Sequence, residues 1–382
     1  MNPAAAYDFA PLLRLALFGL VLASAPLAWV WLRHRGAQTA QRQRALTLLT
    51  LFLTFDLVLF GAFTRLTDSG LGCPDWPGCY GNASPVGAHE QIAAAQSAMP
   101  TGPVTQRKAW IEMTHRYLAV GVGVLILVLA ASTWVAARRK DSALSPWRPT
   151  LTLVWVCVQG AFGALTVTMK LYPAIVTLHL MGGMVLLALL AAQAQAYSPA
   201  PLRLEPRIKA FLWGVALLAI IQIALGGWVS TNYAVLACSD FPQCHASWWP
   251  EMDFALGFTV IRELGMAGDG SYLPFAALTA IHYVHRLVAY ALLLALPALA
   301  WGLRAQVGPT LRRWAFALIA VAAWQLASGL SNVLLSWPLV GAVAHTAGAA
   351  ALVTLLTLLI CRAQQAGAEP NHLAESGPRA NS

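Results

Sequence analysis

Runs of predominantly apolar residues, each about 20 residues long, recur along almost the whole chain, separated by short polar connections and two long ones. One such run, folded as an α-helix, crosses the roughly 30 Å of hydrocarbon in a bilayer. The runs lack the alternation of barrel strands and are about twice as long, so we predict an all-α polytopic membrane protein. The expected spans are residues 11–32, 46–66, 110–137, 150–170, 175–197, 208–231, 276–302, 312–333 and 339–361.

The composition agrees with this interpretation. Of the 382 residues, 58% are hydrophobic and 10% are charged, whereas roughly a quarter of the residues in a soluble domain carry charge. The formal net charge of +9 would suggest a nucleic-acid partner for a soluble protein. Here the cations gather in alternate connections, where anionic lipid headgroups of the bilayer are their natural partners, and no nucleic acid is needed. They follow the first, third, fifth and seventh spans (Arg33, Arg35, Arg42, Arg44; Arg138, Arg139, Lys140, Arg148; Arg203, Arg207, Lys209; Arg304, Arg312, Arg313).

The placement of these cations predicts an orientation. Connections rich in Lys and Arg stay in the cytoplasm, so we expect a periplasmic N-terminus, a cytoplasmic C-terminus and outward loops at 67–109 and 232–275. No basic segment precedes the first span, which favours a retained helix over a signal peptide. The N-terminus is neither Arg-rich nor Ser-rich, which favours a bacterial inner membrane over a mitochondrial one.

An internal repeat organises the chain after the first span. GAFTRLTDSGLGCPDWPGC at 61–79 matches GGWVSTNYAVLACSDFPQC at 226–244 with an offset of 165, and EMTHRYLA at 112–119 matches HYVHRLVA at 282–289. A third set of positions matches with an offset of 166. The matched pairs include Gly61/Gly226, Cys73/Cys238, Asp75/Asp240, Pro77/Pro242, Cys79/Cys244, His115/His285, Arg116/Arg286, Gln159/Gln325, Gly163/Gly329 and His179/His345.

The repeat predicts two pseudo-symmetric four-helix bundle halves and one extra N-terminal transmembrane helix. An even number of spans separates the halves, so both run in the same direction. We place the halves at 46–198 and 199–362. Residues 1–45 hold the extra helix and a basic cytoplasmic connection, and 363–382 form a polar tail without apolar periodicity, expected to be disordered and cytoplasmic.

Each half carries two histidines near the outward ends of its second and fourth helices. They are His115 with His179, and His285 with His345. Neutral imidazoles on two facing helices are the usual means by which a bundle holds a haem iron from both sides. The sequence therefore predicts two haem sites, each within about two turns of the outer membrane surface. A histidine bonded to a neighbouring helix is the alternative for any one of the four, and zinc is a weaker one because no third ligand lies at this depth.

Charged residues accompany the histidines. Arg116 and Arg286 each follow one, and a buried arginine needs an anionic partner, for which a haem propionate is the candidate and a lipid phosphate the alternative. Glu112 lies one turn from His115, whereas the second half has His282 at the matching place. Because only the first site has a carboxylate, we assign the chemical reaction to the first half and a permanently bound cofactor to the second. A structural bond from Glu112 to Arg116 or to a loop is the alternative.

Cysteine pairs lie in both outward loops. The pairs are Cys73 with Cys79 and Cys238 with Cys244. We expect each to form a disulfide in an oxidising compartment, while an electron relay or transient binding of a haem-delivery partner is the alternative for the first. Asp56 lies mid-span and is a candidate for proton transfer, or for pairing with a polar group such as Gln222.

Several of these segments resemble the signature sequences of the heme A synthase family. They are GAFTRLTDSGLGCPDWPGCYG from 61, EMTHRYLA from 112, the HL at 179, HRLVAY from 285 and AHTAGA at 344–349. The resemblance covers about 46–361. It implies eight helices in two four-helix halves, so the span at 11–32 is an addition to the family fold.

The resemblance implies an oxidoreductase of cytochrome oxidase assembly that converts the ring-D methyl of haem O to the formyl group of haem A by two hydroxylations and loss of water. It implies that His285 and His345 ligate a haem b cofactor, that His115 and His179 are associated with the haem O substrate, and that Glu112 is the essential acid. Glu112 would accept a proton or stabilise a cationic methylene. Haem O synthase, a protohaem farnesyltransferase, is the expected supplier of substrate. The external electron partner is unidentified, and a homo-oligomer is compatible with the sequence.

Two other functions use many of the same residues. A di-haem electron-transfer protein would use the four histidines but leave Glu112 without a role. A haem transport or insertion chaperone would explain the histidines and outward loops, but it would leave the porphyrin chemically unchanged.

Overall fold

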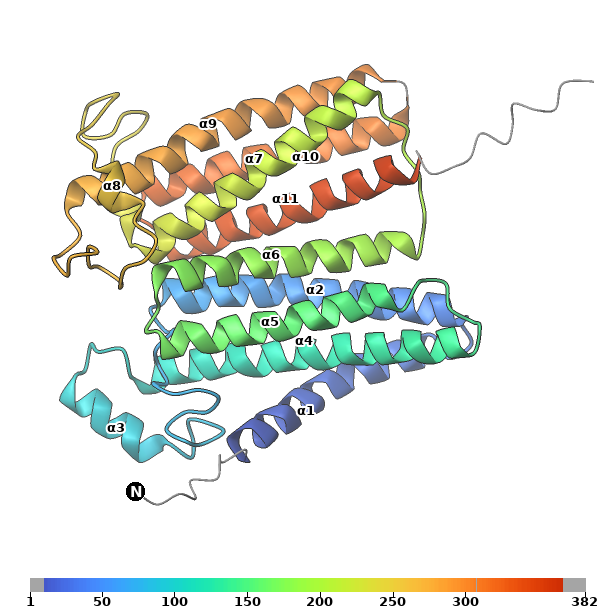
Figure 1. Cartoon of the computed structure of the whole chain (residues 1–382), viewed down its shortest axis with the longest axis horizontal. Coiled ribbons are helices and arrows are strands. Elements are labelled where there is room, and N and C mark those ends of the chain that lie inside the picture. The colour runs from blue at the N-terminus through green and yellow to red at the C-terminus, as the bar shows by residue number, and fades with distance from the viewer. Residues whose placement is uncertain (1–9, 307, 367–382) are drawn as a thin grey trace, which may run out of the picture.

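The computed structural model describes residues 10–306 and 308–366, whose regular elements are helices. Their bounds are α1 (Ala10–Arg33), α2 (Thr39–Leu66), α3 (His89–Ala98), α4 (Gln106–Arg138), α5 (Trp147–Thr168), α6 (Pro173–Ala196), α7 (Pro206–Thr231), η1 (Ala234–Ala237), α8 (Phe254–Gly257), α9 (Phe275–Ala305), α10 (Pro309–Leu334) and α11 (Leu339–Gln365). The long helices lie side by side with their axes roughly aligned, and α3 and α8 belong to loops at one end (Figure 1).

Nine helices of the described part of the chain are long and apolar enough to cross a membrane, which confirms the nine predicted spans. The helices extend beyond the predicted limits at their polar ends, since α2 begins at Thr39 and α4 at Gln106. At the start of α4 the hydroxyl of Thr105 accepts a 3.2 Å hydrogen bond from the backbone N–H of Lys108 and caps the first turn. Hydropathy marks the part of a helix within lipid, whereas backbone hydrogen bonding continues into the headgroup region.

One predicted boundary was wrong. The helix α11 continues to Gln365, so 363–365, the first residues of the predicted disordered tail, are helical. The rest of that tail from 367 onwards lies outside the described residues. The short helices α3, η1 and α8 in the outward loops were not predicted, because they lack an apolar run of membrane-spanning length.

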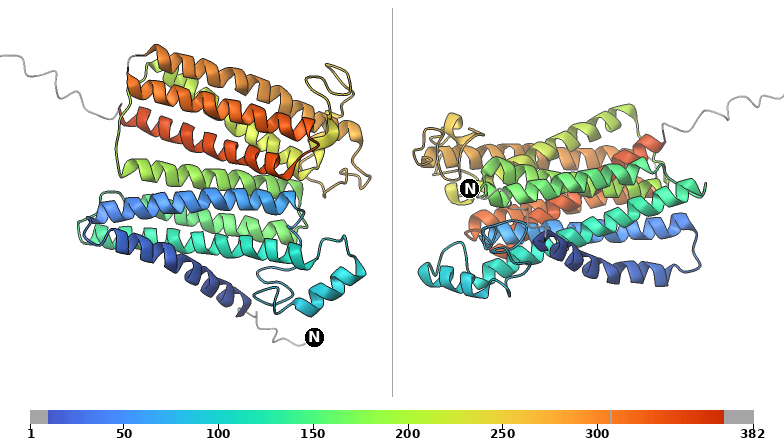
Figure 2. Two further views of the ribbon diagram at one scale, coloured as in Figure 1. Left: turned by 180° about the vertical axis from the view of Figure 1, so that it is seen from behind. Right: turned by 60° about the horizontal axis from the view of Figure 1, so that its bottom comes forward.

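The long helices after α1 form two closed rings of four. In the first, α4 contacts α2 and α5, and α6 contacts the same two helices, so α4 and α6 lie diagonally across the ring. In the second, α9 and α11 both contact α7 and α10 and lie diagonally in the same way. The helices α2 and α6 of the first ring face α7 and α11 of the second, and Figures 1 and 2 show the two groups side by side.

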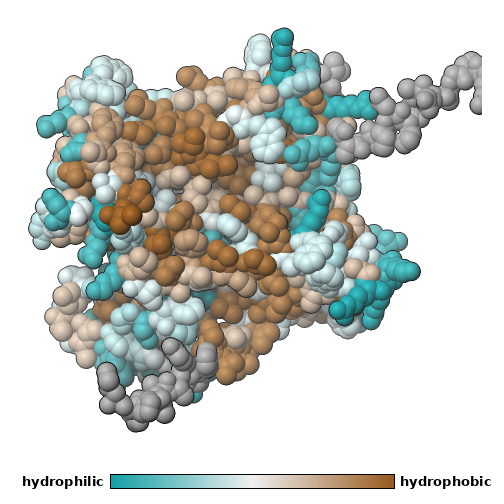
Figure 3. Space-filling model, in the orientation of Figure 1, coloured by the Kyte–Doolittle hydropathy of each residue, from teal (hydrophilic) through white to brown (hydrophobic). Residues whose placement is uncertain are grey.

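The first helix lies outside both rings. It packs against α4 and to a smaller extent against α2, and it crosses them at a slant (Figure 1). The face of the molecule seen in Figure 3 carries a broad apolar band over the helices, with polar residues concentrated towards the two ends. This band and the spanning helices identify a multi-pass membrane protein.

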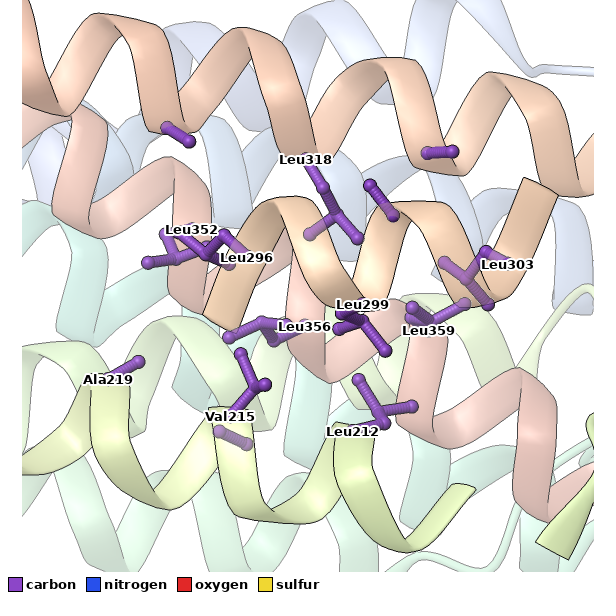
Figure 4. Close-up of a cluster of buried hydrophobic side chains, with 14 of the residues drawn as sticks. Leu212, Val215, Ala219, Leu296, Leu299, Leu303, Leu318, Leu352, Leu356 and Leu359 are labelled. Atoms are coloured by element: carbon purple, nitrogen blue, oxygen red, sulfur yellow. The ribbon is translucent and has the colours of Figure 1, made fainter. Parts of the chain in front are cut away.

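A leucine-rich core closes the second ring at the end opposite α8 (Figure 4). Its fully buried members come from all four helices and include Leu212, Leu299, Leu303, Leu318 and Leu359. Lipid tails are as apolar as leucine, so close packing rather than exclusion from water stabilises such a cluster within a membrane. Because this core fills one end of the ring, the polar side chains of the helix interiors gather at the other end.

Candidate haem-binding site

The four predicted histidines lie at the end of the molecule that carries α3 and α8. Each is within about three turns of the start of its helix, and all four helices begin at this end (Figure 1). His115 on α4 and His179 on α6 lie on diagonal helices of the first ring. His285 on α9 and His345 on α11 are related in the same way in the second ring. None of the four is fully exposed or fully buried, so each imidazole keeps surface that a ligand could cover.

Each imidazole packs against a glycine of the neighbouring helix. A Cβ atom added to Gly61 would lie 3.0 Å from Cε1 of His115, and one added to Gly226 would lie 3.1 Å from Cε1 of His285. Gly163 and Gly329 face His179 and His345 at 3.5 and 3.3 Å. These glycines entered the sequence comparison only as matched positions of the repeat. In the structure they leave room for the histidine rings.

In the second ring, polar side chains contact the histidine rings. The amide nitrogen of Gln222 lies 3.1 Å from Nδ1 of His285 and 3.4 Å from Nε2. The hydroxyl of Ser328 lies 3.0 Å from Nδ1 of His345. With its amide oriented to satisfy its neighbours, Gln325 also donates to Nδ1 of His345, at 3.1 Å.

The first ring differs at the same atoms. Nδ1 of His115 and Nδ1 of His179 are buried and have no hydrogen-bond partner among the described residues. Gln159, the sequence equivalent of Gln325, packs against Gly182, and its amide nitrogen is also buried without a partner. The histidine pairs therefore share their placement but not their hydrogen bonding.

Glu112 is buried beside the first pair, and both of its carboxylate oxygens have partners. The backbone N–H of Cys73 donates to one oxygen at 2.8 Å, and Arg116 donates to the other across one helical turn. The structural bonds that were the alternative explanation for Glu112 are therefore present, both to Arg116 and to the loop. Such bonding fixes the position of the carboxylate one helical turn from His115.

The two predicted propionate partners point at the outward loops. Arg116 donates to the carbonyl oxygens of Asp75, Pro77 and Gly78, and its guanidinium is buried. Arg286 donates to the carbonyl oxygens of Asp240, Gln243 and Cys238. Each arginine thus holds the loop that carries the cysteine pair of its own half.

His282 occupies the place in the second half that Glu112 occupies in the first. Nε of Arg286 donates to Nε2 of His282 at 3.2 Å, again across one helical turn. The second half therefore has the same loop-holding arginine as the first, but its partner on the helix is an imidazole. The sequence difference that assigned chemistry to the first half is retained in three dimensions.

Both predicted disulfides are present. Cys73 is joined to Cys79 and Cys238 to Cys244, and all four residues are fully buried. Tyrosines of the helices below bind the same loops, since Tyr117 donates to the carbonyl of Ala83 at 2.6 Å and Tyr283 donates to that of Trp248. Each histidine pair is thus covered by a loop that is bonded to the helix beneath it.

A pocket that sequence analysis did not predict opens next to the first pair. It has a volume of about 270 Å³ and lies where α2 ends and α4 begins. Ile111, in its wall, is one helical turn from His115. The remaining lining residues are three hydroxyl side chains and two cations, Thr67, Ser69, Thr105, Arg107 and Lys108. Hydroxyls and cations in one pocket are a signal for anion binding, but only the fold brings the end of α2 to the start of α4.

Asp56 does not have the partner that was considered for it. Asp56 is exposed on α2, and Gln222, which was considered as its partner, contacts His285 instead.

The structure also bears on the zinc alternative. In the part of the chain that the structure describes, no group of three or more His, Cys, Asp and Glu side chains could hold a metal ion. Structural zinc needs four ligands, whereas a haem iron needs two axial ligands, and each ring has two diagonal histidines.

Comparisons with known proteins agree with the resemblance noted in the sequence. A family model described as "Cytochrome oxidase assembly protein" (COX15-CtaA) matches residues 44–357. The chain is 36% identical to a "Heme A synthase" of Shewanella oneidensis over 325 residues, which cover 81% of this chain and 93% of the relative. It is 30% identical to one of Paracoccus denitrificans over 85% of this chain and 87% of the relative, and 28% identical to one of Allorhizobium ampelinum over 82% and 89%.

Proposed function

The chain belongs to the heme A synthase family of cytochrome oxidase assembly proteins, and we propose that it oxidises the ring-D methyl group of haem O to the formyl group of haem A. Family membership makes it an enzyme of haem A biosynthesis that acts on a haem substrate in a membrane. The proposal adds the reaction: two successive hydroxylations of one methyl carbon, followed by loss of water from the resulting geminal diol. Each hydroxylation oxidises the carbon by two electrons, and if water supplies the oxygen atom these two electrons and two protons must pass to an external acceptor and to solvent.

The observation that carries the proposal is the difference between the two histidine sites. The first ring has a carboxylate, Glu112, one turn from His115, and the second has the neutral ring of His282 in its place. Two sites that only carried electrons would not need this difference. We therefore assign the haem O substrate to His115 and His179.

We assign a resident haem b to His285 and His345. The residues fit such a group, because the two imidazoles lie on diagonal helices of one ring and keep accessible surface, and Gly226 and Gly329 give their rings space. When bound, haem b would supply reversible one-electron oxidation and reduction. The chain's own residues would hold it between α9 and α11, under the loop of Cys238 and Cys244.

Glu112 would act on the substrate methyl group through its charge. Arg116 and the N–H of Cys73 orient the carboxylate before any substrate binds, and such preorganised charge is effective in a site that excludes water. The carboxylate would stabilise positive charge at the oxidised carbon, or accept the proton released when water adds to it. Arg116 would then act by positioning Glu112 and the loop.

The carboxylates of haem O need cations, and the pocket above His115 offers them. Arg107 and Lys108 lie on the turns that precede His115, and Lys108 is seven residues before it, on the same face of α4. We assign the propionates to this pocket in place of Arg116. The terminal nitrogens of Arg116 and Arg286 already donate to loop carbonyls, and Arg116 donates to Glu112 as well.

The charged connections support an orientation in the membrane. The basic connections after α1, α4, α6 and α9 lie at the end opposite α3 and α8 (Figure 1). By the positive-inside rule, this supports our assignment of both histidine pairs to the periplasmic side of a bacterial inner membrane. The N-terminus would be periplasmic and the C-terminus cytoplasmic. Haem O synthase would deliver substrate, and cytochrome oxidase would receive the product.

The test is chromatography of haems extracted from membranes in which this chain is co-expressed with haem O synthase, in a host that makes no haem A. We expect haem A, or its hydroxymethyl precursor, only when the chain is present, and neither with Glu112→Ala. Haem O and haem B alone, together with redox activity unchanged by Glu112→Ala, would favour the electron carrier. Extracted haem identical to the haem supplied, held loosely and reversibly, would favour the chaperone.

A further inference from the structure

The hydrogen bonding of the histidine rings differs between the two halves at every position where it can be compared. In the second ring Gln222 contacts His285, and Ser328 and Gln325 contact His345, with closest distances of 3.0–3.1 Å. In the first ring the corresponding Nδ1 atoms of His115 and His179 are buried and unpartnered among the described residues.

The sequence explains this difference residue by residue. Gln222 lies one turn before Gly226 on α7, the glycine that faces His285. In the first half the residue one turn before Gly61 is Leu57, which has no hydrogen-bonding group. Ser328 directly precedes Gly329 on α10, whereas Phe162 directly precedes Gly163 on α5. Both replacements put an apolar side chain where the second half has a polar one.

A polar partner matters to an imidazole that binds iron. An imidazole that ligates a metal through Nε2 carries its proton on Nδ1, and that N–H needs an acceptor. The oxygen atoms of Gln222, Ser328 and Gln325 can accept it, because an amide can turn by half a rotation and a hydroxyl oxygen has free lone pairs. Such partners fix the orientation of the ring and raise the basicity of the ligand, and their loss typically lowers metal affinity by about 10–100-fold.

We propose that Gln222, Ser328 and Gln325 are positioning residues that make the second histidine pair the slowly exchanging haem site, and that the apolar residues Leu57 and Phe162 keep the first pair in a rapidly exchanging state. The inference rests on the proposed function, because it explains how one fold keeps a cofactor in one half and releases a product from the other. An enzyme that must discharge haem A cannot hold it as firmly as a permanent cofactor.

The test measures the transfer of haem b from the purified full-length chain to an excess of apomyoglobin. We expect a fast and a slow phase, with the fast phase absent in His115→Ala and the slow phase absent in His285→Ala. Gln222→Leu, which places in the second half the residue that the first half has, should accelerate the slow phase about tenfold or more. Ser328→Ala should act in the same direction, and Leu57→Gln should slow the fast phase.

Gln159→Leu is the matched control, since it makes the same change at the first-half equivalent of Gln325 and should leave the slow phase unaltered. Electron paramagnetic resonance of the ferric protein gives a second readout, because low-spin g-values depend on the orientation of the axial imidazoles and should change with Gln222→Leu. A slow phase and g-values unchanged in both Gln222→Leu and Ser328→Ala would overturn the inference. The transfer assay contains no haem O, so its result does not depend on haem A formation. A chain that shows the expected phases in this assay but forms no haem A in the co-expression test would refute the proposed function and leave this inference standing.

Discussion

The backbone N–H of Cys73 donates a 2.8 Å hydrogen bond to the buried carboxylate of Glu112, which lies 39 residues further along the chain. Arg116 holds the other carboxylate oxygen and three carbonyl groups of the same loop. The outward loop, its disulfide and the acid beside the first histidine pair therefore form one connected unit. A change in the loop is expected to reach the carboxylate.

Glu112→Gln should abolish most haem A formation while leaving the chain loaded with haem b. The amide keeps the size of the side chain but removes the charge, and loss of a general acid or base typically costs about 10²–10⁴-fold in rate. Haem chromatography of the co-expressing membranes measures both quantities in one sample. Haem A formation close to that of the unaltered chain would show that the carboxylate is only structural.

Gly72→Ala should displace the first loop from α4. A Cβ atom on Gly72 would overlap the backbone of Lys108 and Ala109, and the first turn of a helix cannot yield as a flexible side chain can. We expect a loss of about 1–3 kcal/mol in stability, and less haem A, because the bond between Cys73 and Glu112 would be broken. Gly123→Ala is the control, since no heavy atom lies within 4 Å of its added Cβ. Equal thermal stability of the two variants would contradict the prediction.

Replacing both Cys73 and Cys79 by Ser should lower haem A formation without releasing haem b. A disulfide that closes so short a loop stabilises the folded state by about 2 kcal/mol, and the contacts of Arg116 with loop carbonyls should keep part of the loop in place. The matched control replaces Cys238 and Cys244, whose loop is held by Arg286, and it should chiefly affect haem b retention. Identical effects of the two double variants on haem content and on product would count against separate roles for the loops.

Much of the fold could be predicted because each spanning helix corresponds to one continuous apolar run in the sequence. Hydropathy over the thickness of a bilayer predicted the nine spanning helices of the described residues, and pairs of cysteines within one loop predicted both disulfides. The short helix α3 could not be found in this way. It lies outside the bilayer-length runs, and tertiary contacts with α4 accompany it.

The contacts of the candidate site were harder to predict, because they join distant segments. Arginine beside a histidine suggested a haem propionate as its partner. In the structure Arg116 binds Glu112 and loop carbonyls, and Arg286 binds loop carbonyls, whose directions depend on loop geometry that no residue pattern reveals. The glycines facing the histidines were visible as matched positions of the repeat. Their steric role required knowing which helices are neighbours.

Asp240 should make the second loop sensitive to acid. Its carboxylate accepts hydrogen bonds from the backbone N–H groups of Ala246 and His245, each at 2.9 Å, and these bonds hold the pKa of Asp240 below its usual range. The stabilisation is therefore complete above the unfolded-state pKa of about 4 and is lost as the pH falls through the lower folded-state pKa. Hydrogen exchange of residues 240–247, corrected for intrinsic rates, should be constant from pH 5 to 8 and increase below about pH 4. Asp240→Asn should remove this dependence, and an equal acid response of the variant would assign the effect to another group.

Arg65 and Tyr233 join the two rings at their outward ends. Arg65 donates to the carbonyl of Ser230 at 2.6 Å and lies over the ring of Tyr233, whose hydroxyl donates to Asp68 at 2.7 Å. Both hydrogen bonds connect residues 165 positions apart, which is the offset of the sequence repeat, so the bonded residues are equivalent positions of the two halves. Contacts between equivalent positions are expected where two related halves pack against each other.

Arg65→Met should therefore lower the stability of the association between the rings. We expect a loss of about 1–2 kcal/mol, because a hydrogen bond from a charged group and a cation–π contact disappear together while the apolar stem remains. Tyr233→Phe keeps the aromatic ring and removes only the bond to Asp68, so its effect should be smaller. Thermal unfolding in detergent measures both, with Arg313→Met as the control at an exposed cation of the opposite end. A melting temperature for Arg65→Met equal to that of the control would show that Arg65 adds nothing to the packing of α2 and α6 against α7 and α11.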